Sequence, residues 1–120
     1  MLTLLNPKRS DVQPVEAEAL ADTGAHYLIL PERIRAQLEL EQLETRQATL
    51  ADGSRQTVPY VGPVQVRFKN RSGFFGALVM GDEVLLGAIP MEDMDLIVVP
   101  KERRVEINPE HPHYAAGMAK

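Results

Sequence analysis

Apolar and polar residues alternate along several short stretches of this chain, and residues that favour turns separate these stretches. Residues 15–21 alternate apolar residues with glutamates, and residues 64–68 place Val64, Val66 and Phe68 on one side of an extended backbone. A period of two predicts β-strands with one face in the core and the other in water. The short spacing between turns therefore predicts a small β sandwich or barrel.

The pattern predicts short strands joined by turns, with two short helices. Residues 31–39 and 88–94 are the expected helices, because a proline is tolerated in the first turn of a helix. Asp52-Gly53 predicts a hairpin near residues 49–58, since both residues tolerate a positive φ. The polar residues 40–48 are expected to cross the surface. The other expected strands are residues 2–5 (as an edge strand), 15–21, 28–30, 61–68, 74–80, 84–87, 95–100 and 105–107.

These elements define an all-β single domain with one or two short helices. A chain of 120 residues fits one domain, expected over residues 1–108, and residues 109–120 are expected to form a loose tail. The net charge of −4, without a basic run, argues against a nucleic-acid partner. No apolar run is long enough to span a membrane, and residues 1–5 are too short for a signal-peptide core. We therefore expect no membrane partner and a cytoplasmic location.

The chain has no cysteine, which excludes disulfides, thiol nucleophiles and thiolate metal ligands. His111 and His113 lie two residues apart in the proline-interrupted tail without a cluster of further ligands. Such a pair is usually solvated, so no metal site is expected.

Asp22-Thr23-Gly24-Ala25 is the stretch that most indicates chemistry rather than folding. It follows the alternating residues 15–21 and precedes apolar residues, so a tight turn is expected to hold a carboxylate between two buried strands. A carboxylate in such a place is costly unless another group pairs with it or the protein uses it. Asp22 is therefore the first candidate for a functional residue.

These pieces, in this order, resemble the retropepsin-like aspartic proteases, the single-domain family that includes retroviral proteases. The resemblance covers about residues 2–107. In that family an alternating strand delivers Asp-Thr-Gly-Ala, a flexible flap hairpin follows, and two apolar residues and a glycine precede a short helix and a closing strand. Here these parts look like residues 22–25, the hairpin around Asp52-Gly53, Leu85-Leu86-Gly87, and the helix at 88–94. The resemblance implies a closed, barrel-like retropepsin fold and an aspartic endopeptidase without metal or organic cofactor.

Peptide hydrolysis by carboxylates needs one ionised Asp to accept a proton from water and one protonated Asp to donate a proton to the carbonyl oxygen. This chain contains a single Asp-Thr-Gly and no Asp-Ser-Gly, so the resemblance implies a homodimer with one catalytic Asp22 from each copy. By resemblance, Thr23 forms a hydrogen bond across the dimer, Gly24 allows close approach of the substrate backbone, and Ala25 keeps the cleft open. The terminal strands, residues 2–5 and 105–107, would interleave across the interface.

The expected partner, besides a second copy, is a peptide or protein substrate. A mobile hairpin over the cleft supplies backbone hydrogen bonds and excludes water. The residues expected to touch substrate, from the hairpin and from the cleft, are Leu50, Ala51, Asp52, Gly53, His26 and Leu85. The alternative for the hairpin is an ordinary exposed turn.

The chain also departs from the retroviral pattern. His26 and Ala88 stand where retroviral members have an acidic residue and an arginine that pair with each other. His26 could tune the pH response, bind a substrate carboxylate or be a rim residue without a role. Two other interpretations therefore stand beside the protease: a peptide-binding or protein-binding module of the same fold without proteolysis, and an unrelated small β domain in which residues 22–25 form only a turn.

Overall fold

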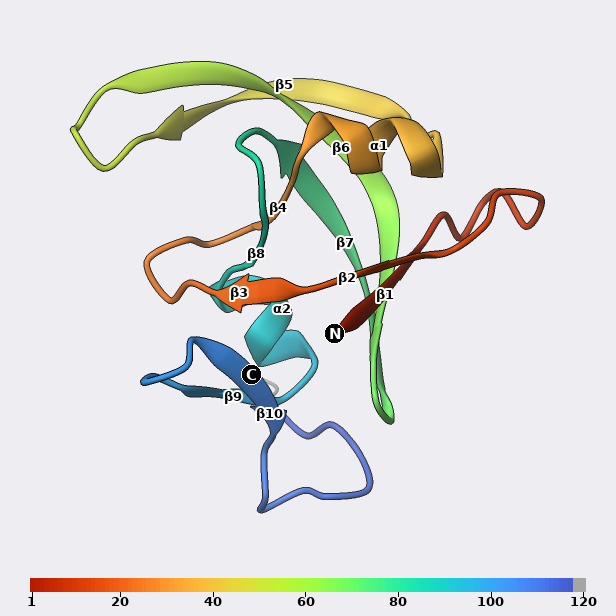
Figure 1. Cartoon of the computed structure of the whole chain (residues 1–120), viewed down its shortest axis with the longest axis vertical. Helices are drawn as coiled ribbons and strands as arrows, with labels where there is room; N and C mark the ends of the chain where they lie inside the picture. Colours follow the sequence, from red (N-terminus) through yellow and green to blue (C-terminus); the bar gives the residue numbers. More distant parts are fainter. Residues whose placement is uncertain (118–120) are drawn as a thin grey trace.

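A computed structural model describes residues 1–117, which contain ten strands and two helices (Figure 1). Residues 118–120, the end of the predicted tail, lie outside this description. The helices are α1 (Glu32–Leu38) and α2 (Ala88–Asp93), and within the described residues neither is long and apolar enough to cross a membrane. The strands are β1 (Leu2–Leu5), β2 (Val15–Ala17), β3 (Ala19–Ala21), β4 (Leu28–Leu30), β5 (Gln42–Thr49), β6 (Arg55–Phe68), β7 (Arg71–Val79), β8 (Val84–Leu86), β9 (Leu96–Val99) and β10 (Arg104–Ile107).

Eight of the strands form one sheet that nearly closes on itself. Its order is β2-β1-β6-β7-β4-β8-β3, and β5 pairs with β6 beside this path. The first and last strands of the order, β2 and β3, are consecutive in the chain with Glu18 between them. Figure 1 shows them as one segment that crosses the molecule. A single covalent connection therefore joins the two ends of the sheet, and the result is a barrel-like β domain, as the sequence predicts at this coarse level. The strands β9 and β10 form a separate two-stranded sheet.

One principal apolar core lies inside the curved sheet. Leu4, Leu28 and Leu86, from three different strands, are fully buried in it. Helix α1 adds Ile34 and Leu38, the pair that the sequence places on one helix face. A smaller cluster, made of Ala48, Val58 and Leu78, joins the β5–β6 hairpin to β7. The hairpin is therefore packed against β7 as far as Ala48 and Val58, and residues 51–57 are exposed.

One prediction about strands is incomplete and another is wrong. Residues 40–48 are expected only to cross the surface, and Gln42–Thr49 forms β5 there; only Ala48 of this strand is buried, so no apolar alternation reveals it. Residues 2–5 form a strand, but it is not an edge strand, because β1 pairs with β2 on one side and with β6 on the other. Both edges of β1 are thus occupied, so residues 2–5 are not free to pair with a second copy.

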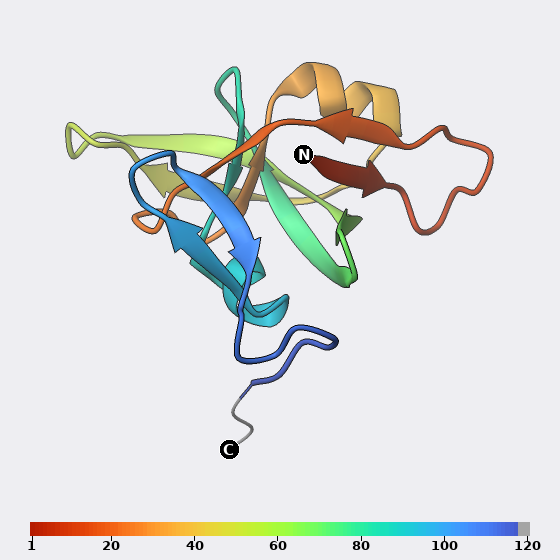
Figure 2. The same cartoon turned by 60° about the horizontal axis from the view of Figure 1, so that its bottom comes forward.

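The described part of the predicted loose tail is attached to the domain. The carboxylate of Asp95 accepts a hydrogen bond from Asn108 Nδ2 at 3.0 Å and lies 2.7 Å from His111 Nδ1. The guanidinium of Arg71, which is only 2% exposed, donates to the carbonyl oxygen of His111. The segment after β10 consequently loops back beside the end of the β6–β7 turn, as Figure 2 shows.

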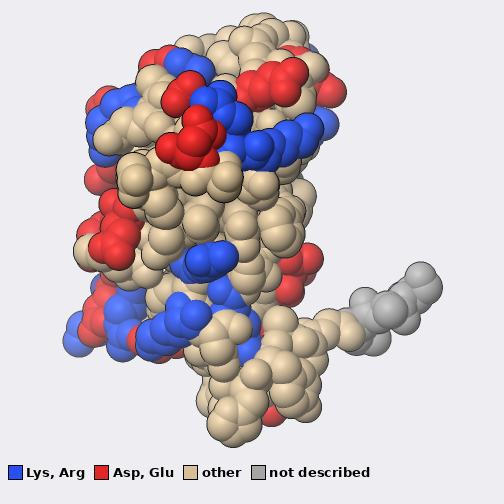
Figure 3. Space-filling view, turned by 90° about the vertical axis from the view of Figure 1, so that its right-hand side faces the viewer, with Lys and Arg blue, Asp and Glu red and all other residues tan. Residues whose placement is uncertain are grey.

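The surface carries charges of both signs. Figure 3 shows Lys and Arg side chains next to Asp and Glu side chains, with an uncharged area near the middle of this face. Arg9 pairs with Asp11, and Arg35 pairs with Glu32. This mixture agrees with the small net charge of −4.

Candidate functional site

Asp22 lies at the end of β3, where the strand leaves the sheet. β3 pairs with β8 in parallel, with Ala21 opposite Leu86, and the N–H of Asp22 continues this pairing by donating to the Leu86 carbonyl oxygen at 3.0 Å. The turn then closes on the aspartate itself: its Oδ1 accepts from the Gly24 N–H at 3.0 Å, and its carbonyl oxygen accepts from the Ala25 N–H at 3.1 Å. The predicted tight turn therefore exists and fixes a half-buried carboxylate.

The start of α2 holds the other side of this turn. The N–H of Ala88 donates to the carbonyl oxygen of Ala25 at 2.8 Å, and the N–H of Ile89 donates to that of His26 at 2.9 Å. Gly87 permits this contact, because a Cβ there would lie 2.5 Å from the carbonyl oxygen of Tyr27. Residues 22–27, which we call the Asp22 loop, are thus held between β8 and α2 by backbone contacts.

An apolar row extends from the Asp22 loop across three strands. Leu85 of β8 pairs with Leu20 of β3 on one side and with Ile29 of β4 on the other, so the three side chains share a face of the sheet. Asp22 comes two residues after Leu20, and side chains alternate along a strand, so its carboxylate projects on this same face. All three apolar side chains are only half-buried. The carboxylate therefore stands at the end of an open apolar surface.

A depression of about 370 Å³ lies on this surface. Its lining consists of Ile29, Met80, Gly81, Asp82, Glu83 and Leu85. Leu85, one of the residues predicted to contact substrate, is thus placed in a hollow that an apolar side chain can enter.

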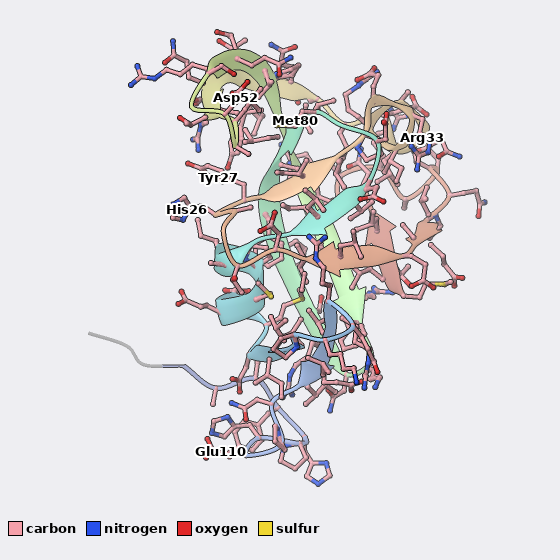
Figure 4. All side chains as sticks on the ribbon, turned by 60° about the vertical axis from the view of Figure 1, so that its left-hand side comes forward. His26, Tyr27, Arg33, Asp52, Met80 and Glu110 are labelled. Atoms are coloured by element: carbon pink, nitrogen blue, oxygen red, sulfur yellow. The ribbon has the colours of Figure 1, made fainter. Side chains whose placement is uncertain are left out.

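The tip of the β5–β6 hairpin lies on the same side of the molecule as the Asp22 loop. Figure 4 shows Asp52 at the tip above Tyr27 and His26, with Met80 nearby. Asp52 is engaged within its own turn, where its Oδ1 accepts from the Ser54 hydroxyl at 2.5 Å and from the Ser54 N–H at 2.8 Å. These two hydrogen bonds lower the pKa of the Asp52 carboxyl from its usual value. Gly53 supplies the positive φ of 85° that the turn requires.

The predicted site residues therefore fall into two groups. Asp22, Thr23, Gly24, Ala25 and His26 are brought together in the Asp22 loop, and Leu85 lies on the apolar surface beside it. Leu50, Ala51, Asp52 and Gly53 form the hairpin tip, whose Leu50 N–H donates to the Ser54 carbonyl oxygen at 2.8 Å.

A larger depression, of about 640 Å³, does not have Asp22 in its lining, but it shares Asp82 and Glu83 with the smaller one. It is bounded by α1, β2–β3 and the turn before β10, and its charged lining includes Glu16, Arg33, Glu83 and Arg103. Acidic and basic side chains are mixed there, so no single ligand charge is favoured. Among residues 1–117, moreover, no group of three or more His, Cys, Asp or Glu side chains could hold a metal ion.

Four aromatic or apolar residues beside the site are not predicted as site residues, among them Leu20 of the apolar row. Tyr27 ends the Asp22 loop, while Ile29 and Met80 line the smaller depression. Ile29 stands in an apolar run that is typical of a buried strand, and only its pairing with Leu85 shows that it faces the open surface. No local pattern in the sequence distinguishes it from Leu28, which is fully buried.

No protein-family model matches this chain, and no curated protein matches it either. The geometry of the site therefore carries the functional argument.

Proposed function

We propose that two copies of this chain form an aspartic endopeptidase of the retropepsin-like type, with Asp22 of each copy in the active site. The observation that carries the proposal is the Asp22 loop. The Gly24 N–H donates to the Asp22 carboxylate, and the Asp22 N–H donates to the Leu86 carbonyl oxygen. The Asp22 carboxylate lies on the same face as the apolar row and on the same side of the molecule as the hairpin tip. The order of these parts along the chain resembles the family pattern.

The single chain leaves room for a second copy at this loop. Thr23 and Gly24 are exposed, and Ile89, whose N–H is bonded to the loop, is 48% exposed. A two-fold axis beside the loop would bring the two Asp22 carboxylates together and cover these residues. In this arrangement Thr23 is the residue placed to hydrogen-bond across the axis.

The reaction follows from two carboxylates that share one proton. The ionised Asp22 accepts a proton from a water molecule, whose oxygen attacks the peptide carbonyl carbon. The protonated Asp22 of the other copy donates its proton to the carbonyl oxygen, which gives a neutral tetrahedral diol. In the collapse of the diol, the carboxylate that is now ionised takes a proton from one diol hydroxyl, the C=O bond forms again and the C–N bond breaks. The proton held by the other carboxyl passes to the leaving nitrogen. Activity should therefore be highest at acid to mildly acidic pH.

The substrate is an extended peptide lying between the Asp22 loops and the hairpins. The half-buried row of Leu20, Leu85 and Ile29 favours an apolar side chain next to the scissile bond. The hairpin tips would close over the peptide and offer backbone hydrogen-bonding groups.

Replacement of Asp22 by Asn tests the proposal. Asp22→Asn should abolish cleavage of a peptide library by purified protein and leave the fold unchanged, because the amide cannot exchange protons as a carboxyl does. Asp11→Asn is the matched control, since Asp11 lies in an exposed turn and pairs with Arg9. Cleavage that survives in Asp22→Asn, made in a host that lacks contaminating proteases, contradicts the proposal. A wild-type dimer that binds peptides without cutting them would instead identify the binding module.

A further inference from the structure

Arg46 of β5 stands between two tyrosines from different parts of the chain. Its guanidinium carbon lies 3.7 Å from the centre of the Tyr60 ring and 5.5 Å from the centre of the Tyr27 ring. Its Nη1 donates to the Tyr27 hydroxyl at 3.2 Å, and its Nε donates to Glu44 at 3.1 Å. The two tyrosine rings meet edge to face, with centroids 6.1 Å apart. One arginine therefore contacts both rings of an aromatic pair.

Tyr60 fixes the base of the hairpin to β7. It pairs with Leu78, and its hydroxyl fills the space above Gly76, where a Cβ would lie 2.0 Å from the Tyr60 oxygen. Arg46 and Tyr60 belong to the two arms of the same hairpin, since Arg46 pairs with Val58 and Glu44 pairs with Tyr60. The contact between Arg46 and Tyr60 therefore lies within the hairpin and links its two arms.

Tyr27 belongs to the other side of the site. It ends the Asp22 loop, and its carbonyl oxygen stands against Gly87 at the start of α2. Figure 4 shows its side chain pointing from this loop toward the hairpin. The hydrogen bond from Arg46 to Tyr27 thus joins the hairpin to the loop that carries Asp22. Movement of the part of the hairpin that carries Arg46 away from the loop has to break this bond.

We propose that Arg46 is a positioning residue that latches the β5–β6 hairpin to the Asp22 loop through Tyr27. The latch is reversible, because the Arg46 side chain keeps 33% of its surface exposed and water can replace the Tyr27 hydroxyl as its partner. In its closed form it sets the height of the hairpin tip above Asp22. Its effect on catalysis rests on the proposed endopeptidase function, whereas its effect on hairpin mobility does not.

Amide hydrogen exchange of residues 47–57 tests the latch in the wild-type protein and in three variants. Tyr27→Phe removes only the hydroxyl, and Arg46→Gln removes the cation. Arg55→Gln is the matched control, because Arg55 is an exposed arginine on the other arm of the hairpin. Exchange should become about three- to tenfold faster in Tyr27→Phe and Arg46→Gln and stay unchanged in Arg55→Gln. Exchange in both test variants that equals the control overturns the latch.

Steady-state kinetics on a cleaved peptide give the second measurement. Loss of the latch should raise KM by about three- to tenfold while kcat changes less than about twofold, because hairpin closure binds substrate and Asp22 is untouched. Faster exchange with an unchanged KM overturns the role of Arg46 in substrate binding. If exchange responds as expected in a protein that cleaves no peptide, the latch stands and the endopeptidase proposal fails. If the protein cleaves peptides and exchange in both test variants equals the control, the endopeptidase proposal stands and the latch fails.

Discussion

The carbonyl oxygen of Tyr27 lies against Gly87 so closely that a Cβ on the glycine would stand 2.5 Å from it. That contact brings the end of the Asp22 loop onto the start of α2. The neighbouring atoms are backbone too: the same Cβ would lie 2.8 Å from the Ala25 carbonyl oxygen. No side-chain rotation can relieve such a clash, so the shape of the loop depends on the absence of a side chain at residue 87.

Gly87→Ala should therefore displace the Asp22 loop. We expect a loss of roughly 1–3 kcal/mol in the free energy of unfolding, which is typical of overpacking, together with a large loss of the proposed peptidase activity. Urea denaturation and peptide cleavage measure the two effects. Gly117→Ala is the control, because no atom lies within 4 Å of the Cβ added there. A Gly87→Ala protein as stable and active as the control would contradict this account of the loop.

Gly76→Ala should disturb the anchor of the hairpin. The new methyl group would meet the Tyr60 hydroxyl at 2.0 Å, so the ring must move, and we expect a loss of roughly 1–3 kcal/mol in the free energy of unfolding. Tyr60→Leu in the same chain should recover part of this loss, because the smaller side chain frees the space. A double-mutant cycle by urea denaturation measures the coupling. Simple additivity of the two changes would show that Tyr60 and Gly76 act independently.

Acid should release the tail segment that Asp95 holds. Hydrogen bonds from Asn108 and from the Ala116 N–H, with the neighbouring His111, lower the pKa of the Asp95 carboxyl from its usual value. A group whose pKa is lower in the folded protein stabilises the fold above its unfolded pKa, about 4 for Asp, and this contribution is lost as the pH falls through that value toward the folded pKa.

Asp95→Asn should therefore have a lower melting temperature than the wild type at pH 7. The difference in melting temperature between the two proteins should be smaller at pH 3 than at pH 7. Thermal unfolding followed by circular dichroism at both pH values measures this change. Asp11→Asn is a less suitable control here, because Asp11 also has a lowered pKa through its contact with Arg9. Glu110→Gln, an exposed change in the same tail, serves better. An equal deficit at pH 7 and pH 3 would show that ionisation of Asp95 does not hold the tail.

Mixing experiments test the proposal that two copies share one active site. If each dimer needs both Asp22 carboxylates, an equal mixture of wild-type and Asp22→Asn chains that exchange freely should retain only about one quarter of its dimers with two aspartates. Activity per wild-type chain should consequently fall by about half after subunit exchange. Adding Asp11→Asn chains instead should raise it about twofold, because every dimer then keeps two Asp22 carboxylates. Activity that ignores the inactive chains would contradict a site built from two copies.

Local signals in the sequence predict much of the site. The turn at residues 22–25, the hairpin at Asp52-Gly53 and the helix after Gly87 each depend on a few adjacent residues, and the structure contains all three. What the sequence does not reveal are contacts between distant segments. β5 has almost no buried face, the strand β1 gains its second neighbour only through β6, and the link from Arg46 to Tyr27 joins two segments with no shared pattern. Such contacts arise from the closure of the whole sheet rather than from periodicity.

Glu18 is too short a connection to allow a change of register in the strands that it joins. It alone connects β2, which is held to β1 with Ala17 opposite Leu2, to β3, which is held to β8 with Ala21 opposite Leu86. If β3 slipped along β8 by one residue, Ala21 would turn outward and the side chains of Leu20 and Asp22 would turn into the core. In a flat sheet, a strand at a free edge could shift in this way. Here the residues on both sides of Glu18 are already paired, Ala17 with β1 and Ala19 with β8, so the connection prevents the shift. The direction in which the Asp22 carboxylate points is thus set by the circumference of the barrel as much as by the turn around it.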